Sequence, residues 1–158
     1  MLTIRPAEPR DCALLLSLVL ELAAYERQAD EVTATEADLL RAGFGPTPRF
    51  EACLAEWDGA PAGFALWFYN FSTWNGRHGL YLEDLFVRPA LRGKGIGKAL
   101  LVHLARLAEA QGCGRYQWQV LDWNTPSIQF YEALGARRLP EWLTMRVEGA
   151  ALSALARR

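Results

Sequence analysis

A switch from strand to helix at residues 80–101 constrains this chain most. Strand-forming residues run from Leu80 to Val87 and end at Arg88-Pro89, and Arg92-Gly93-Lys94-Gly95-Ile96-Gly97-Lys98 then leads into an apolar pattern of helical period. Because glycine has no Cβ, backbone N–H groups in such a turn can approach one ligand together, with the positive end of a helix dipole behind them. That arrangement suits phosphate, and three basic side chains add positive charge. A plain strand-to-helix turn with solvated basic residues is the alternative.

Two well-known phosphate motifs do not fit this turn. The P-loop needs four residues between its first glycine and the Gly-Lys pair, but Gly93 and Gly97-Lys98 are one residue too close, and Ala99 lacks the hydroxyl that magnesium requires. The dinucleotide-binding fingerprint spaces its glycines differently. From Arg92 to Gly97 the pattern is Arg-x-x-Gly-x-Gly, which resembles the acetyl-CoA pyrophosphate loop of the GNAT acetyltransferase superfamily.

Length and composition predict one folded domain over residues 1–158. The chain is 51% apolar and carries a formal net charge of −1, so no basic excess argues for nucleic acid. Its three cysteines form no C-x-x-C pair and are expected to be reduced, and no metal-ligand spacing occurs. No stretch is long and apolar enough to cross a membrane, and no basic-then-apolar leader is present. We therefore expect a cytoplasmic protein without a metal.

The periodicities along the chain predict an α/β domain in the order β-α-α-β-β-β-α-β-α-β. The expected strands are 2–5, 50–57, 61–71, 80–87, 116–121 and 142–147. The expected helices are 8–24, 35–43, 95–111 and 125–135, followed by a small apolar tail helix at 150–156. Asp58-Gly59 is a strong hairpin signal, and Thr35 and Thr125 can act as helix caps. This order resembles the GNAT fold, in which helices flank a mixed, mostly antiparallel central sheet.

A second group of residues lies at Asn124-Thr125-Pro126-Ser127 and Tyr131. Asn124 and Tyr131 are about two turns apart on one side of a predicted helix. An aromatic residue that simply packs in the core would give the same spacing. Together with the glycine-rich turn, however, the segment resembles the part of GNAT enzymes in which the asparagine touches CoA and the tyrosine faces the thioester. A phenol in that place can protonate the departing thiolate as a general acid.

Two adjacent carboxylates, Glu83 and Asp84, interrupt the apolar strand at 80–87. Burying carboxylates is costly, and consecutive strand residues are expected to point to opposite faces, so the pair should do different jobs. One reading makes one of them exposed and the other salt-bridged. The other reading places Glu83 in an amine pocket with Asp84 in support.

Five segments together resemble the spermidine/spermine (diamine) N-acetyltransferase branch of the superfamily: Tyr25-Glu26, Trp74, Leu80 to Asp84, Arg92 to Gly97 and Asn124 to Tyr131. The resemblance implies that Tyr25, Glu26, Trp74, Glu83 and Asp84 bind a small cationic amine. It further implies that the backbone of Leu85, Phe86 and Val87 pairs with the pantetheine of acetyl-CoA, and that the N–H of Leu85 polarises the thioester carbonyl. Members of this branch are commonly homodimers.

The predicted reaction is transfer of an acetyl group from acetyl-CoA to a primary amine by direct attack on the thioester. A primary amine is protonated at neutral pH, so a carboxylate must take its proton, and Glu83 is the predicted base. Tyr131 is the predicted general acid. Two alternatives remain open, namely a protein or peptide N-acetyltransferase of the same fold and a non-catalytic acyl-CoA-binding module.

Overall fold

A five-stranded sheet forms the centre of the computed structural model, which describes residues 1–158. Its strands lie in chain order, and the first three pairings are antiparallel while β4 and β5 run parallel. The strands are β1 (Leu2–Pro6), β2 (Glu51–Trp57), β3 (Ala60–Ser72), β4 (Arg77–Val87) and β5 (Tyr116–Trp118). The expected mixed, mostly antiparallel sheet is confirmed.

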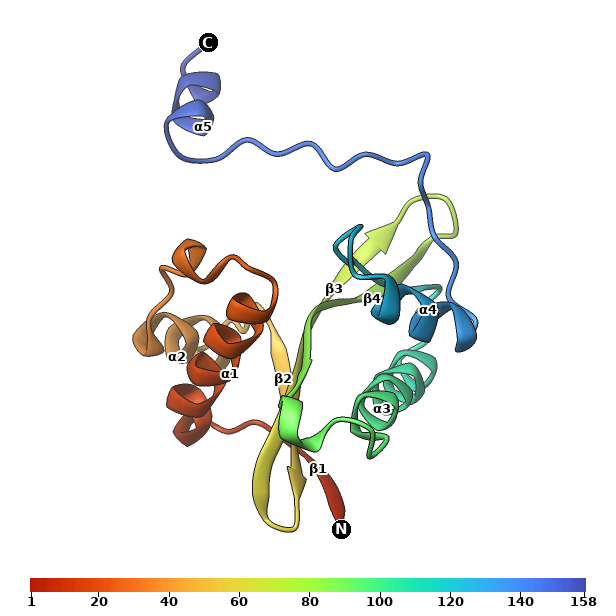
Figure 1. Ribbon diagram of the computed structural model, residues 1–158. Coiled ribbons are helices and arrows are strands. Elements are labelled where there is room, and N and C mark those ends of the chain that lie inside the picture. The colour runs from red at the N-terminus through yellow and green to blue at the C-terminus, as the bar shows by residue number, and fades with distance from the viewer. The chain divides into compact units, whose positions relative to one another are not determined.

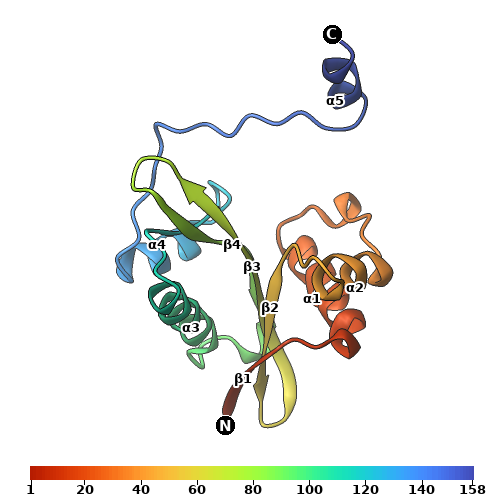
Figure 2. The same cartoon turned by 180° about the vertical axis from the view of Figure 1, so that it is seen from behind.

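Helices cover both faces of this sheet (Figures 1 and 2). The helices α1 (Cys12–Tyr25) and α2 (Glu36–Phe44) lie on one face, and α3 (Ile96–Ala110) lies on the other. Short 3₁₀ turns stand at η1 (Pro9–Asp11), η2 (Ala29–Glu31) and η3 (Pro89–Leu91). The core on the α1 side is a buried cluster of apolar side chains from α1 and the central strands: Leu15, Leu18, Leu22, Leu54, Phe64, Leu66 and Phe86. Burial of such side chains is the main force that holds the layers together.

Local sequence signals explain most of the element ends. Thr35 accepts a hydrogen bond from the backbone N–H of Asp38, whose carboxylate accepts one in return from the N–H of Thr35, so the predicted capping box at α2 is confirmed. Gly43 does not end α2 as predicted, because the helix continues to Phe44. A Cβ at Gly43 would collide with the ring of Phe50, so this glycine is explained by close packing.

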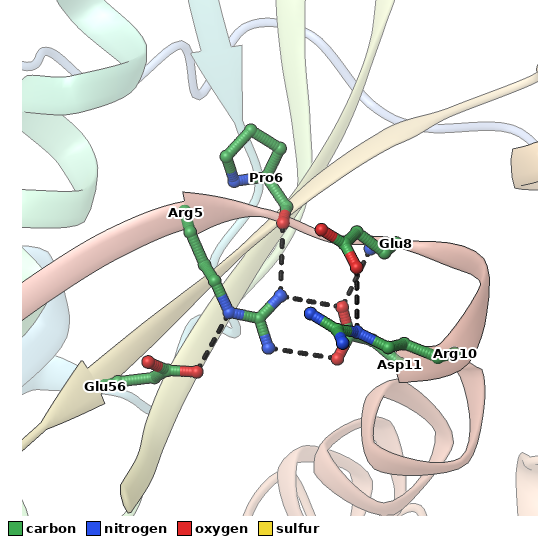
Figure 3. A network of polar contacts seen from close by, with 6 residues as sticks. All are labelled: Arg5, Pro6, Glu8, Arg10, Asp11 and Glu56. Carbon is green, nitrogen blue, oxygen red and sulfur yellow. Dashed lines mark hydrogen bonds and ion pairs between the residues drawn. The ribbon is translucent and has the colours of Figure 1, made fainter. Parts of the chain in front are cut away.

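The start of the chain is held to β2 by an ion network around Arg5 (Figure 3). The Arg5 guanidinium donates to both carboxylate oxygens of Asp11, at 2.8 and 3.0 Å, and its Nε donates to Glu56 Oε1 at 2.9 Å. The hydrogen bonds from Arg5 hold the pKa of the buried Asp11 carboxyl below its usual range. The network fixes where α1 begins, because Asp11 immediately precedes that helix.

A β-bulge in β4 interrupts the regular alternation of side chains at Glu83. Asp84 pairs with Leu66 of β3 but Leu82 pairs with Trp67, which leaves Glu83 as the extra residue. Because alternation along β3 continues, the partners of Phe64, Leu66 and Phe68 share one face, and these partners are Phe86, Asp84 and Tyr81. That face is the one that α1 covers, since Phe64, Leu66 and Phe86 belong to the α1 core cluster. Strict alternation, which would put Tyr81 and Asp84 on opposite faces, therefore does not hold across Glu83.

The chain divides into two compact units, Met1–Gln119 and Val120–Arg158. It holds α4 (Thr125–Ala133) and α5 (Gly149–Ala156). The predicted strand at 116–121 ends at Trp118, and the predicted strand at 142–147 is not formed. A strand needs a neighbour for its N–H and C=O groups, and residues 142–147 belong to no ladder although their side chains alternate in polarity. None of the helices is long and apolar enough to span a bilayer.

Candidate active site

The glycine-rich turn between β4 and α3 has the geometry of an anion site. Gly93 and Gly95 adopt positive φ angles of 80° and 78°, which L side chains rarely adopt, so glycine is needed at both positions. A Cβ at either residue would meet no protein atom within 4 Å, so the space that a ligand would fill is open. Gly95 is the N-cap of α3 and supplies no side-chain cap, so the first N–H groups of α3 are available to an anion.

The entrance to this turn is fixed by Arg88 at the end of β4. Its guanidinium forms two hydrogen bonds to the carboxylate of Glu21, at 2.8 and 3.1 Å, and donates to the carbonyl oxygen of Pro61 at 3.1 Å. A bidentate arginine–carboxylate pair is geometrically specific. The pair therefore fastens the last residue before η3 to α1.

Arg92 and Lys94 contact aromatic rings of the sheet and of α1. The Nζ atom of Lys94 lies 5.1 Å from the centroid of the Trp57 ring. The Cζ atom of Arg92 lies 4.8 Å from the centroid of the Tyr25 ring and 5.7 Å from that of Phe86, which are cation–π distances. Both cations thus remain at the turn while their side chains are held against rings.

The backbone of β4 offers an open edge next to the turn. The β4–β5 ladder comprises only three residue pairs, from Leu80 with Tyr116 to Leu82 with Trp118. From Glu83 to Val87, β4 therefore pairs with β3 alone. Arg92 Nε occupies one group of the free edge by donating to the carbonyl oxygen of Val87 at 3.0 Å. An extended ligand could pair with the rest of this edge as an added strand does.

Three carboxylates interact at the middle of β4. Asp84 is half-buried on the α1 side, and its pKa is raised to about 7 by loss of hydration and then by the negative charges of Glu83 and Glu26. Glu26 follows the last residue of α1, and burial also raises the pKa of its carboxyl. No basic side chain forms a hydrogen bond or salt bridge with Asp84. A cation bound there would lower the cost of burying this carboxylate.

Two aromatic residues without a predicted site role, Phe68 and Tyr81, lie beside these carboxylates. Tyr81 and Phe68 stack with ring centroids 5.1 Å apart, and the bulge puts Tyr81 on the same face as Asp84. Loss of hydration and the charge of Glu83 raise the pKa of the Tyr81 hydroxyl. Only the register of β3 against β4 brings this pair together, so no local sequence signal could have identified it.

The structure does not bring Trp74 to the carboxylates. Trp74 lies in the turn between β3 and β4 and is 89% exposed. The strand pair extends from the Leu66–Asp84 pair to the Ser72–Arg77 pair before the turn begins. At about 3.3 Å per residue, that distance is about 20 Å along the hairpin.

In the second unit, Asn124 immediately precedes α4 and Tyr131 lies within it. Asn124 is buried and its Oδ1 accepts a hydrogen bond from the backbone N–H of Ser127 at 3.4 Å, so Asn124, not the predicted Thr125, caps this helix. Pro126 lies in the first turn, as predicted. The half-buried Tyr131 ring lies 5.6 Å from that of Phe130. Asn124 and Tyr131 are seven residues apart, which corresponds to about two helical turns.

The chain is similar to known acetyltransferases in sequence and in structure. The Acetyltransferase (GNAT) family profile matches residues 16–136. The chain is 40% identical to the thialysine N-epsilon-acetyltransferase of Bos taurus, over 97% of this chain and 96% of that protein. It is 39% identical to the human spermidine/spermine N(1)-acetyltransferase-like protein 1, over 84% of this chain and 20% of that protein. Among solved structures, an integron cassette protein from the mobile metagenome of V. cholerae superposes with a TM-score of 0.83 at 30% identity, covering 99% of this chain and 98% of that chain.

Proposed function

Because the chain belongs to the GNAT acetyltransferase family and is an N-acetyltransferase, we propose that its acceptor is the primary amine of a small cationic molecule. A diamine, a polyamine or a thialysine-like amino acid has the required chemistry. The observation that carries the proposal is the cluster of Glu26, Glu83 and Asp84, whose mutual repulsion a bound ammonium group would relieve. Relatives named for thialysine, spermidine/spermine and L-ornithine acetylation support the same class of acceptor.

The residues of the β4–α3 turn suit acetyl-CoA, which supplies the activated acetyl thioester. Gly93, Gly95 and Gly97 with the N–H groups at Ile96 would hold the pyrophosphate, and Arg92, Lys94 and Lys98 would supply positive charge. The free edge of β4 at Leu85, Phe86 and Val87 would hold the pantetheine. We propose that the N–H of Leu85 polarises the acetyl carbonyl. From the family resemblance we also propose that Asn124, Pro126 and Ser127 contact CoA.

Carboxylates and an aromatic wall would select the amine. Asp84 and Glu26 would neutralise one ammonium group, and a cation or alkyl chain can lie against the stacked rings of Phe68 and Tyr81. A site with several carboxylates favours cations over neutral or anionic acceptors by Coulomb attraction. We retain Tyr25 and Trp74 as predicted acceptor contacts from the family resemblance, although Trp74 lies at the hairpin tip.

Proton transfer completes the proposed mechanism. The amine must lose a proton before it attacks the thioester directly, and Glu83, exposed at the bulge, is the proposed base. Tyr131 is the proposed acid that returns a proton to the CoA sulfur. Backbone N–H groups of β4 can stabilise negative charge that develops on the carbonyl oxygen. No covalent enzyme intermediate is required.

A thiol-release assay with acetyl-CoA tests this function. The acceptor panel is spermidine, putrescine, thialysine, lysine, ornithine and a peptide with a free N-terminus. Turnover on at least one small amine, with the peptide inactive, is the expected result. Turnover on the peptide alone would favour a protein acetyltransferase, and CoA binding without any turnover would favour a non-catalytic module.

We also propose that the protein is a homodimer in the cytoplasm. The exposed apolar side chains of residues 142–147, such as Leu143 at 83% and Met145 at 89% exposure, would be covered by association. Three free cysteines suit a reducing compartment. Sedimentation velocity at micromolar concentration tests the dimer, and a monomer across the concentration range would contradict it.

A further inference from the structure

Three contacts hold the side chain of Arg92 beside the glycine turn. Its Nε donates to the carbonyl oxygen of Val87 at 3.0 Å. Its guanidinium carbon lies 4.8 Å from the ring centroid of Tyr25 and 5.7 Å from that of Phe86. An exposed arginine normally keeps most of its rotamer freedom, so these contacts restrict a side chain that would otherwise be mobile.

Tyr25 provides the only one of these contacts that comes from outside β4. It is the last residue of α1, whereas Val87 and Phe86 belong to the strand that leads into the turn. The ring of Tyr25 therefore ties the C-terminal end of α1 to the first residue of the Arg-x-x-Gly-x-Gly sequence. One helical turn earlier in α1, Glu21 Oε1 accepts a hydrogen bond of 2.8 Å from Nη2 of Arg88, which directly follows β4.

We infer that Tyr25 is a positioning residue for the cofactor loop, because its ring holds Arg92 and so fixes the turn that takes the pyrophosphate. The family resemblance places Tyr25 with Glu26 on the acceptor side, and Glu26 acts on the charge of Asp84. The contact between the Tyr25 ring and Arg92 adds a role toward the cofactor loop. The inference rests on the proposed acetyl-CoA site.

The inference predicts that the ring of Tyr25 matters for CoA affinity. A cation–π contact acts through the face of the ring, so Tyr25→Phe should retain CoA affinity within about twofold. Tyr25→Leu removes the ring, and an exposed cation–π contact corresponds to a roughly two- to fivefold weaker Kd. Tyr69→Leu is a matched control, because Tyr69 and Tyr25 are both 38% exposed and Tyr69 packs on His78 instead.

Titration calorimetry with CoA on the full chain measures these affinities. The expected result is a two- to fivefold rise in Kd for Tyr25→Leu, with Tyr25→Phe and Tyr69→Leu close to the parent protein. If the Leu variant does not fold, Tyr25→Met replaces it. An unchanged Kd in the folded non-aromatic variant would overturn the inference, whereas failure of the parent protein to bind CoA would overturn the proposed function first.

A double-mutant cycle separates positioning from a general structural effect. If Tyr25 acts through Arg92, then Tyr25→Leu should change the CoA Kd by less than about 1.5-fold in an Arg92→Leu background. If the Kd of the double variant changes by the product of the two single-variant factors, the inference is overturned. With the amine identified by the acceptor panel, Tyr25→Leu should raise the KM for acetyl-CoA more than the KM for the amine. A larger rise in the KM for the amine than in the KM for acetyl-CoA would overturn the inference.

Discussion

Replacement of Asp84 by Asn should make the protein more stable and less active. Asp84 has a pKa of about 7 against a reference value of 3.8, because burial removes its hydration and because Glu83 and Glu26 repel its charge. One pKa unit corresponds to about 1.4 kcal/mol, so this shift sets an upper bound of about 4 kcal/mol. Relaxation and water around a half-buried group reduce that bound, and we expect about 2 kcal/mol.

The pH dependence gives the sign of this effect. A carboxyl whose pKa is raised by folding favours the folded state only while it is protonated. Its contribution is therefore most favourable below pH 3.8 and is lost as the pH rises through about 7. Above pH 7 the Asn variant, which cannot ionise, should be more stable than the parent protein, and the difference should shrink as the pH falls toward 4.

Thermal unfolding of both proteins between pH 5 and pH 8 measures this difference. For a chain of 158 residues, about 2 kcal/mol corresponds to a rise in Tm of about 4–8 °C at pH 8. Asp30→Asn, in the exposed turn η2, is the control and should leave Tm unchanged. Equal Tm values at pH 8, or a difference that grows on acidification, would refute the argument that Asp84 carries a buried, repelled charge.

The same variant should lose activity. An ammonium held by a half-buried carboxylate is a charge-assisted contact worth about 1.5–3 kcal/mol, so kcat/KM for the amine should fall about 10- to 100-fold at pH 8. In the parent protein kcat/KM should rise with pH through about 7 as Asp84 ionises. If kcat/KM still rises with pH through about 7 in the Asp84→Asn variant, another group is responsible for that rise.

Three further substitutions test the proposed chemistry. Tyr131→Phe should lower kcat about 10²- to 10⁴-fold with little change in acetyl-CoA Kd, since only proton donation is removed, and an unchanged kcat would exclude this role. Glu83→Gln should lower kcat by a similar factor and alter the pH–rate profile, whereas a normal profile would exclude Glu83 as the base. Gly95→Ala should weaken CoA binding about tenfold or more, because a methyl group enters the open space at the turn. Gly59→Ala, with the similar φ of 80° in the β2–β3 hairpin, controls for backbone strain and should bind CoA normally.

Much of the fold follows from short-range signals in the sequence. Alternation predicts the central strands within a few residues, the Asp58-Gly59 turn sets the β2–β3 hairpin, and Thr35 with Asp38 begins α2. The Arg-x-x-Gly-x-Gly sequence likewise identifies the turn before α3, because positive φ and a close approach to a ligand both require glycine at fixed positions. These features depend on residues close together in the chain, so one sequence is enough to predict them.

The arrangement of the site depends on pairings that the sequence does not reveal. The bulge at Glu83 exists only because β3 and β4 pair in one register, and it puts Tyr81 on the same face as Asp84. Arg92 meets Tyr25, which lies 67 residues earlier in the chain, and no local pattern encodes that contact. The β4 edge is free because β5 pairs with only three residues of it, a property of two strands and not of either one.

The segment at residues 142–147 shows most clearly the difference between a local preference and a tertiary pairing. Its alternating sequence fits a strand, and the sequence alone fixes that preference through side-chain period. In the structure it belongs to no strand and no ladder. Side-chain period is encoded residue by residue, whereas a strand's hydrogen bonds are made with another segment of the chain. The sequence by itself therefore determined the glycine turn, the helices and the strand preferences. Only the tertiary structure decided which strands pair and which side chains meet at the site.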